Sequence, residues 1–236
     1  IDNSDMRRGQ RTVKSRWNNR VAMYTGDFIF SKALKVASDI EDPRVHQILS
    51  HTMRELSLGE IEQIQDQYNW HQNIRRYLLR IKRKTALLMA ISCQLGAIAA
   101  GAPDTISRSL YYFGYYTGMS YQIIDDVLDF TATEKQLGKP AASDLKQGNV
   151  TLPTLLALRS SDVSDQLLQL LESNDKKNVE WKTILQLIQS SGMITESEKV
   201  SRKYIDKAYK ILESLPTSKH TQHMVKIADY ISKRTY

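Results

Sequence analysis

The sequence has few of the residues on which cross-linked or turn-rich proteins depend. Its 236 residues include one cysteine, ten glycines and five prolines. A single cysteine excludes a disulfide framework and any zinc site built on several cysteines. So few glycines and prolines argue against a β-sandwich or barrel, which needs many tight turns. We therefore expect a helical protein whose cysteine stays reduced, and a cytoplasmic location.

Long hydrophobic runs are also lacking. The most apolar stretch, residues 85–102, only reaches the lower limit for a membrane span, about 18 residues. It contains Ser92 and Gln94 and follows a run of lysines and arginines. We expect it to form a buried helix of a soluble bundle, and we predict no stable membrane insertion.

The charge has a basic surplus. Lysine and arginine number 33 against 26 aspartates and glutamates, which gives a net charge of +7. Such a surplus suits an anionic partner, which could be nucleic acid, a membrane surface or a small molecule carrying phosphate. The densest basic run, residues 75–84, could be a nucleic-acid patch. We favour a solvated helix face that ends at a phosphate-binding Lys84, and predict no nucleic acid.

Apolar residues recur at helical spacing through most of the chain. This pattern predicts one all-α domain over residues 1–236, made of long antiparallel helices. Gly101 to Asp104 marks a break between two of them, and the helix over 73–93 could break near Lys84. Residues 131–153 hold several glycines and prolines, and a loop of that length in a compact domain is usually functional. The long predicted helices cover 20–37, 44–68, 73–93, 106–130 and 196–215.

Three carboxylates interrupt one apolar helical run. Asp125 and Asp129 lie one helical turn apart, and Asp126 and Asp129 are three residues apart. Like charges at these spacings repel, and aspartate is a poor residue for a helix interior. A divalent cation would relieve the repulsion, and hard oxygen ligands suit Mg²⁺. The alternative is a solvated acidic face, which the surrounding isoleucine, leucine, valine and phenylalanine disfavour.

The segment 118–129 resembles the second aspartate-rich motif of the trans-isoprenyl diphosphate synthases. Residues 138–153, with Gly-Lys-Pro, Ser-Asp-Leu and Gly-Asn-Val-Thr-Leu-Pro, resemble the loop that follows it. Residues 83–88 resemble that family's Lys-Thr helix break. Asp2 and Arg7-Arg8-Gly9 resemble the tail of its first aspartate-rich motif. The four motifs occur in the family's order and extend the resemblance over the whole chain.

The resemblance implies a fold, a reaction and a set of site residues. The fold would be an all-α isoprenoid-synthase-type bundle around a central cavity. The reaction would condense isopentenyl diphosphate with an allylic diphosphate in the presence of Mg²⁺. The implied metal ligands are Asp2, Asp125, Asp126 and Asp129. The implied cationic contacts are Arg7, Lys84 and Lys139 to the allylic diphosphate and Arg8 to isopentenyl diphosphate, and Lys84, Thr85 and Gln122 would take part in catalysis.

Finer features resemble the large catalytic components of bacterial two-component hexaprenyl and heptaprenyl diphosphate synthases. That resemblance implies that the allylic substrate is farnesyl diphosphate and that the product supplies a quinone side chain. It also implies a heterodimer with a small regulatory subunit, and a homodimer is the alternative. We also expect an N-terminally truncated chain that starts inside the first motif. Two other functions stay open, a class I terpene cyclase and a non-catalytic, partner-binding subunit. Three aspartates in the second motif favour chain elongation over both.

Overall fold

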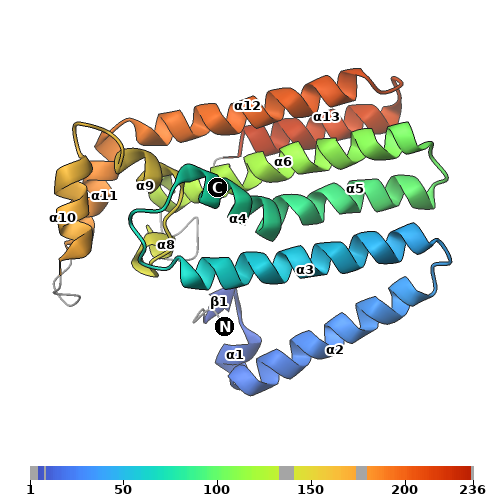
Figure 1. Ribbon diagram of the computed structural model, residues 1–236, viewed down its shortest axis with the longest axis horizontal. Coiled ribbons are helices and arrows are strands. Elements are labelled where there is room, and N and C mark those ends of the chain that lie inside the picture. Colours follow the sequence, from blue (N-terminus) through green and yellow to red (C-terminus); the bar gives the residue numbers. More distant parts are fainter. Residues whose placement is uncertain (1–4, 8, 133–140, 174–179, 235–236) are drawn as a thin grey trace.

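Long helices dominate the fold. The computed structural model describes residues 5–7, 9–132, 141–173 and 180–234. Five long helices run roughly along one axis, and α2 crosses below them at an angle (Figure 1). The five are α3 (Pro43–Gln65), α5 (Leu87–Ala99), α6 (Asp104–Thr131), α12 (Met193–Glu213) and α13 (Lys219–Ser232), and α2 covers Asn19–Ser38.

Shorter elements close one end of the bundle and carry the N-terminal region. At one end lie α8 (Ser143–Lys146), α9 (Leu152–Ala157), α10 (Ser164–Glu172) and α11 (Trp181–Ser190). Below α3 lie α1 (Val13–Arg16) and a two-stranded antiparallel sheet, β1 (Met6–Arg7) with β2 (Gln10–Arg11), in which Met6 pairs with Arg11. The elements α8 to α11 also contribute to the core, since Leu145, Leu167 and Ile184 are buried in one cluster with Phe130 of α6.

Local sequence signals set where the helices begin and end. The side chains of Asn18, Asp42 and Asn73 each accept a hydrogen bond from a backbone N–H of the first turn that follows. Pro43 occupies the first position of α3, where a missing N–H costs nothing. The predicted break after α5 is confirmed, since Gly101 has a φ of 70° and α6 begins at Asp104.

Helix α6 lies at the centre of the bundle, between α5 and α12. Gly114 and Gly118 allow the close approach on the α5 side. A Cβ on Gly114 would stand 2.4 Å from the backbone oxygen of Met89, and one on Gly118 would stand 2.7 Å from Cα of Ala86. No side chain larger than hydrogen fits at either position. The two glycines therefore fix how near α6 comes to the neighbouring helix.

The helix predicted to break near Lys84 does not break. Helix α4 (Ile74–Ile81) continues through η1, a π-helical segment (Lys82–Ala86), into α5. Such π segments are rare and often occur at functional sites. The wider turn lets the chain stay helical where the sequence suggested an interruption. Among the described residues, no helix has the length and apolarity needed to cross a membrane.

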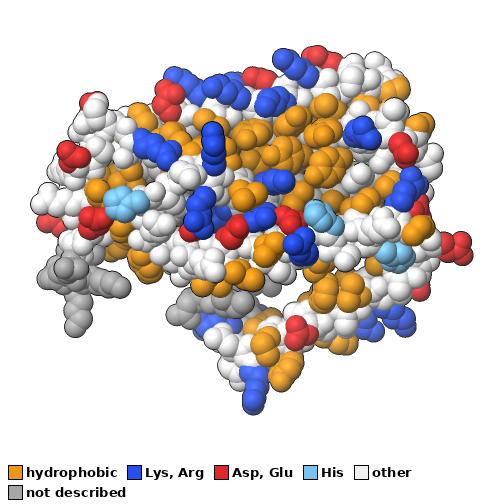
Figure 2. Space-filling model, in the orientation of Figure 1, with side chains coloured by type: hydrophobic (Ala, Val, Ile, Leu, Met, Phe, Trp, Pro, Cys, Tyr) orange, Lys and Arg blue, Asp and Glu red, His pale blue; other side chains and the backbone are white. Residues whose placement is uncertain are grey.

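Hydrophobic side chains also reach the surface, chiefly on α2. Space-filling shows them along α2 and across the middle of this face of the bundle (Figure 2). None of the residues of α2 is buried. Its large exposed hydrophobic residues are Val21, Met23, Tyr24, Phe28, Ile29, Phe30, Leu34 and Val36.

Candidate active site

The site lies where η1 faces the C-terminal half of α6. The close approach at Gly118 brings Thr85 next to α6, and its Oγ1 donates a hydrogen bond of 2.7 Å to Oε1 of Gln122. The other end of the same amide donates from Nε2 to Oδ1 of Asp126 at 2.9 Å. Two residues predicted to act in catalysis are therefore joined to one predicted metal ligand.

Asp126 is a buried carboxyl group of the site with a strongly shifted pKa. It is 3% exposed, and Tyr77, which is fully buried, donates from its hydroxyl to Oδ2 at 2.7 Å. The pKa of Asp126 is raised to about 7, chiefly by burial and also by the carboxylates of Asp144 and Asp125, while the hydrogen bonds from Tyr77 and Gln122 lower it. Its charged form is thus costly here without a nearby cation.

Asp125 lies at the rim of the same site and is partly exposed. Its Oδ1 is 3.1 Å from Nη1 of Arg234, near the C-terminus, and the Arg234 guanidinium stacks over the ring of Tyr121 at 4.6 Å. Asp125 therefore already has a cationic partner within the chain.

Asp129 is hydrogen-bonded to α8. It is fully buried, and it accepts hydrogen bonds from Oγ of Ser143 at 3.0 Å and from the backbone N–H of Asp144 at 3.1 Å. These contacts tie the end of α6 to α8. In the parts of the chain that the structure describes, no group of three or more histidine, cysteine, aspartate or glutamate side chains is gathered around a common point.

The predicted residues surround one cavity. It has a volume of about 600 Å³, and Asp125, Asp126, Gln122, Thr85 and Lys84 all line it. Asp129 does not. The other lining residues are Glu60, Gln63, Tyr77, Arg80, Ile81, Tyr121, Asp144, Gln147, Asn149 and Thr151.

Lys84 points into this cavity from η1. Its Nζ donates to Oε1 of Gln63 at 3.0 Å and lies 3.3 Å from Oε1 of Glu60. Both partners come from α3, so Lys84 is held in place with its charge at the cavity. An ammonium group in this position suits a phosphate ligand as a point charge.

Four predicted residues cannot be compared with the structure. Asp2, Arg8 and Lys139 lie outside the described residues. Arg7 lies in β1, and its side chain is outside what the structure describes. The roles of all four stay predictions.

Tyr77 and Arg80 are among the cavity residues that the sequence analysis did not identify. Tyr77 and Arg80 precede Lys84 by seven and four residues, so they share its helix face. Arg80, expected on a solvated face, is 6% exposed and donates to Gln72 at 2.9 Å and to the backbone oxygen of Val150 at 2.6 Å. Helical spacing back from Lys84 could have identified both residues.

The basic run that could have bound nucleic acid is engaged within the protein. Arg76 pairs with Asp66 at 2.9 Å, and Arg83 pairs with Glu55 at 2.9 Å and with Glu62. With Arg80 and Lys84 also held by protein groups, most of this run is not a basic surface. The arrangement disfavours the nucleic-acid alternative.

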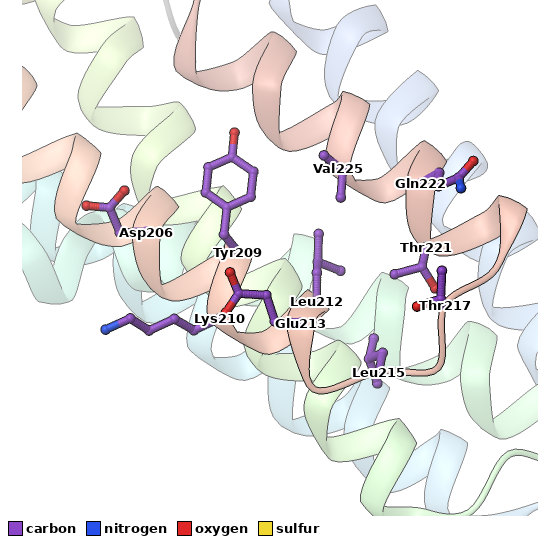
Figure 3. A pocket seen from close by; sticks show the side chains of 10 residues that line it. All are labelled: Asp206, Tyr209, Lys210, Leu212, Glu213, Leu215, Thr217, Thr221, Gln222 and Val225. Carbon is purple, nitrogen blue, oxygen red and sulfur yellow. The ribbon is translucent and has the colours of Figure 1, made fainter.

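A second cavity lies between α12 and α13, at about 750 Å³ (Figure 3). Leu212, Leu215 and Val225 give it apolar walls, while Asp206, Lys210 and Glu213 lie at its edge. It shares no residue with the cavity at Asp126. The chemistry-bearing side chains therefore gather in the other cavity.

Comparison with known proteins identifies the family. The polyprenyl synthetase family model matches residues 1–188. The chain is 50% identical to heptaprenyl diphosphate synthase component 2 of Bacillus subtilis, over 100% of this chain and 67% of that protein. The crystal structure of heptaprenyl diphosphate synthase from Staphylococcus aureus matches with a TM-score of 0.94 at 39% identity, over 99% of this chain and 73% of that one. A decaprenyl diphosphate synthase from Rhodobacter capsulatus matches with a TM-score of 0.89 at 26% identity, over 99% and 72%.

The chain belongs to the polyprenyl synthetase family. It is therefore a prenyltransferase, and its relatives support a long-chain trans-prenyl diphosphate synthase over a terpene cyclase or a non-catalytic subunit. The predicted family resemblance and the all-α isoprenoid-synthase bundle are both confirmed.

Proposed function

We propose that the cavity at Asp126 binds an allylic diphosphate and a divalent cation, Mg²⁺, for chain elongation with isopentenyl diphosphate. The observation that carries this is the cavity that Asp126 shares with the carboxylates of Asp125 and Asp144 and with Lys84; the pKa of Asp126 is raised to about 7 there, chiefly by burial. A cation offsets such repulsion, and oxygen ligands of this kind suit a hard divalent ion. Asp125 and Asp126 would hold it, and when bound it would neutralise the charge that develops on the leaving diphosphate.

The chain's own residues would bind and orient the substrates. Lys84 would offer its charge to the allylic diphosphate. Departure of diphosphate leaves an allylic cation, and the oxygen atoms of Thr85 and Gln122, already fixed by their 2.7 Å hydrogen bond, would face that cation as dipoles. The π bond of isopentenyl diphosphate then attacks the cation, and loss of a proton restores an allylic diphosphate one unit longer. Arg7, Arg8, Lys139 and Asp2 keep the diphosphate and metal contacts that the family resemblance implies.

We also propose the finer identity of substrate, product and partner. Half of the residues are identical to component 2 of a heptaprenyl diphosphate synthase. This supports farnesyl diphosphate as the allylic substrate and a hexaprenyl or heptaprenyl product for a quinone side chain. The word component in that name supports a heterodimer with a smaller subunit. A single, half-buried cysteine agrees with a reducing, cytoplasmic setting.

Product analysis tests this proposal. The protein expressed from its complete gene, with and without its smaller partner, would be incubated with farnesyl diphosphate, isopentenyl diphosphate and Mg²⁺. We expect heptaprenyl or hexaprenyl diphosphate by mass spectrometry, and formation only with the partner present. Full activity of the chain alone would contradict the heterodimer. Cyclic hydrocarbons, or inactivity with the partner present, would contradict the proposed reaction.

A further inference from the structure

A network of hydrogen bonds leads from the hydrophobic core to the cavity at Asp126. Tyr77 of α4 donates from its hydroxyl to Oδ2 of Asp126 at 2.7 Å. The other carboxylate oxygen, Oδ1, accepts from Nε2 of Gln122 at 2.9 Å. Oε1 of Gln122 in turn accepts from Oγ1 of Thr85 at 2.7 Å. These three bonds connect α4, α6 and η1, and the network ends at Gln122 and Thr85, which line the cavity.

The two ends of the network differ in their surroundings. Tyr77 is fully buried and belongs to a hydrophobic cluster that includes Ile81 and Met119. Its ring is therefore held by close packing on several sides. Thr85 and Gln122 are only half-buried, so their side chains can meet a ligand in the cavity. The packed end can thus fix the geometry of the end that faces the ligand.

The hydrogen bonds have fixed directions when Asp126 is ionised. An ionised carboxylate only accepts hydrogen bonds, so the amide of Gln122 turns its NH₂ group to Asp126 and its oxygen to Thr85. The Thr85 hydroxyl then donates its single proton to that oxygen. The lone pairs of the Thr85 oxygen remain for a ligand. The network therefore sets the polarity of Thr85, with the negative end of its dipole available to a cation.

The opposite polarity would follow if the amide of Gln122 were free to turn. A half-turn would place its NH₂ group against Thr85, whose oxygen would accept and whose proton could point into the cavity. Positive dipole ends would then face a positive charge, which is unfavourable. A carboxylate held at one oxygen can still rotate, because the last torsion of an aspartate side chain has broad preferences. Tyr77 holds the second oxygen of Asp126 and so fixes the carboxylate that anchors the amide.

We propose that Tyr77 is a positioning residue for prenyl transfer. Through Asp126 it fixes the amide of Gln122, so that Thr85 and Gln122 turn oxygen lone pairs towards the allylic cation. The inference rests on the proposed function, in which Thr85 and Gln122 face that cation. It adds to that function a core residue that controls the polarity of the two groups.

The test compares two tyrosines that pack against the same hydrophobic cluster. Tyr115 is half-buried against that cluster, and it neither belongs to the network nor lines the cavity. Tyr77→Phe and Tyr115→Phe each remove one hydroxyl oxygen and keep the ring. Calorimetry on protein from the complete gene, with Mg²⁺ present, would measure the binding of two probes. One is farnesyl thiodiphosphate, which is unreactive; the other is an ammonium analogue of farnesyl diphosphate, in which a charged nitrogen replaces the carbon that becomes cationic.

The two probes should respond differently to Tyr77→Phe. We expect this variant to bind the ammonium analogue about tenfold more weakly, which is the scale of one hydrogen bond to a charged group. Binding of farnesyl thiodiphosphate should stay unchanged, because its chain carries no positive charge. For the same reason kcat should fall while KM stays constant, since the cation forms only in the transition state. Tyr115→Phe should match the unmodified protein with both probes.

A double-mutant cycle tests whether Tyr77 acts through Gln122. Gln122→Met removes the amide at similar side-chain length and should itself weaken binding of the ammonium analogue. In that background Tyr77→Phe should have no further effect, because no amide is left to orient.

Three results would overturn the inference. One is unchanged binding of the ammonium analogue by Tyr77→Phe. Another is an equal loss of farnesyl thiodiphosphate binding, including the complete loss in a variant that does not fold, which would indicate that Tyr77 supports the site as a whole. The third is the same tenfold loss when Tyr77→Phe is added to Gln122→Met.

Gln122→Met alone separates the two proposals. Normal binding of the ammonium analogue by this variant would contradict the proposed function of the amide at the cation. If Gln122→Met binds it weakly while Tyr77→Phe binds it normally, only the role of Tyr77 fails.

Discussion

Helices α2 and α6 resemble each other in sequence and differ in environment. Both are long, and both carry apolar residues at helical spacing. Fourteen of the 28 residues of α6 are buried, and the helix packs against α5 and α12, while no residue of α2 is buried. Apolar periodicity therefore predicts that a helix forms, but the neighbours decide which of its residues become core. On the buried helix, the same surroundings raise the pKa of Asp126, chiefly through burial.

The largest expected effect is on turnover, and it compares Asp125 in α6 with Asp39 at the end of α2. We expect Asp125→Ala to lower turnover more than about a thousandfold without unfolding the protein, because it removes a proposed cation ligand and no core volume. Asp39→Ala changes an exposed residue that caps the C-terminus of α2 and should leave turnover unchanged. Steady-state assays of the protein with its partner, and circular dichroism of both variants, check this. Near-normal turnover in Asp125→Ala would refute its assigned role.

The next effect compares one glycine from each helix. Gly114→Ala should lower the free energy of unfolding by more than about 3 kcal/mol, since the new methyl group meets the backbone of Met89. Gly26→Ala, in α2, meets nothing within 4 Å and should raise that free energy by about 0.5–1 kcal/mol through helix propensity. Urea unfolding of the 236-residue chain measures both changes.

The two outcomes together sharpen the comparison. A mild loss in Gly114→Ala would show that α5 and α6 can separate without cost. A loss of stability in Gly26→Ala would contradict the open space that the structure shows around Gly26.

The smallest effect concerns the ion pair that holds η1 against α3. The Arg83 guanidinium donates to Glu55 and lowers the pKa of that carboxyl group below its usual value. The pair therefore stabilises the fold above the carboxyl's unfolded pKa, and the contribution is lost as pH falls through the lower, folded pKa. We expect Glu55→Gln to destabilise the protein at pH 7 by on the order of 1 kcal/mol.

The pH dependence supplies the control. The difference between Glu55→Gln and the unmodified protein should begin to shrink near the unfolded pKa of glutamate, about 4.3, and should be lost once the pH is below the lowered, folded pKa, where Glu55 is also neutral. Urea midpoints at several pH values measure it. A difference that stays constant down to pH 3 would show that Glu55 acts through packing and not through its charge.

Much of the site could be predicted from the sequence because its signals are local. The spacing of Asp125, Asp126 and Asp129, the Lys84-Thr85 pair, and the glycines and prolines after residue 131 all occur within short segments. Five of the predicted residues do line one cavity. Asp129 shows the limit of this reasoning, since spacing places it on the face of Asp125 while its carboxylate binds Ser143 and Asp144.

What could not be predicted depends on contacts between distant segments. The burial of Arg80 requires the oxygen of Val150, 70 residues away in sequence, to accept its hydrogen bond. The partner of Asp126 is Tyr77, 49 residues away. Helix periodicity also cannot distinguish a break from a π segment, because both disturb the pattern at Lys84 in the same way.

The π segment at Lys82–Ala86 has a consequence for how the helix can change. In an α-helix each residue turns the chain by about 100°, so residues seven apart lie on the same side. The side-chain directions at the two ends of a continuous α-helix are therefore fixed relative to each other. The wider π-helical turn changes the rotation of one helix relative to the other without interrupting the helix. The faces of α4 and α5 can then be set independently, one towards the cavity and one towards the packing against α6. Deleting a single residue between positions 82 and 86 would restore the phase and rotate Lys84 and Thr85 away from Gln122, while both flanking helices kept their length.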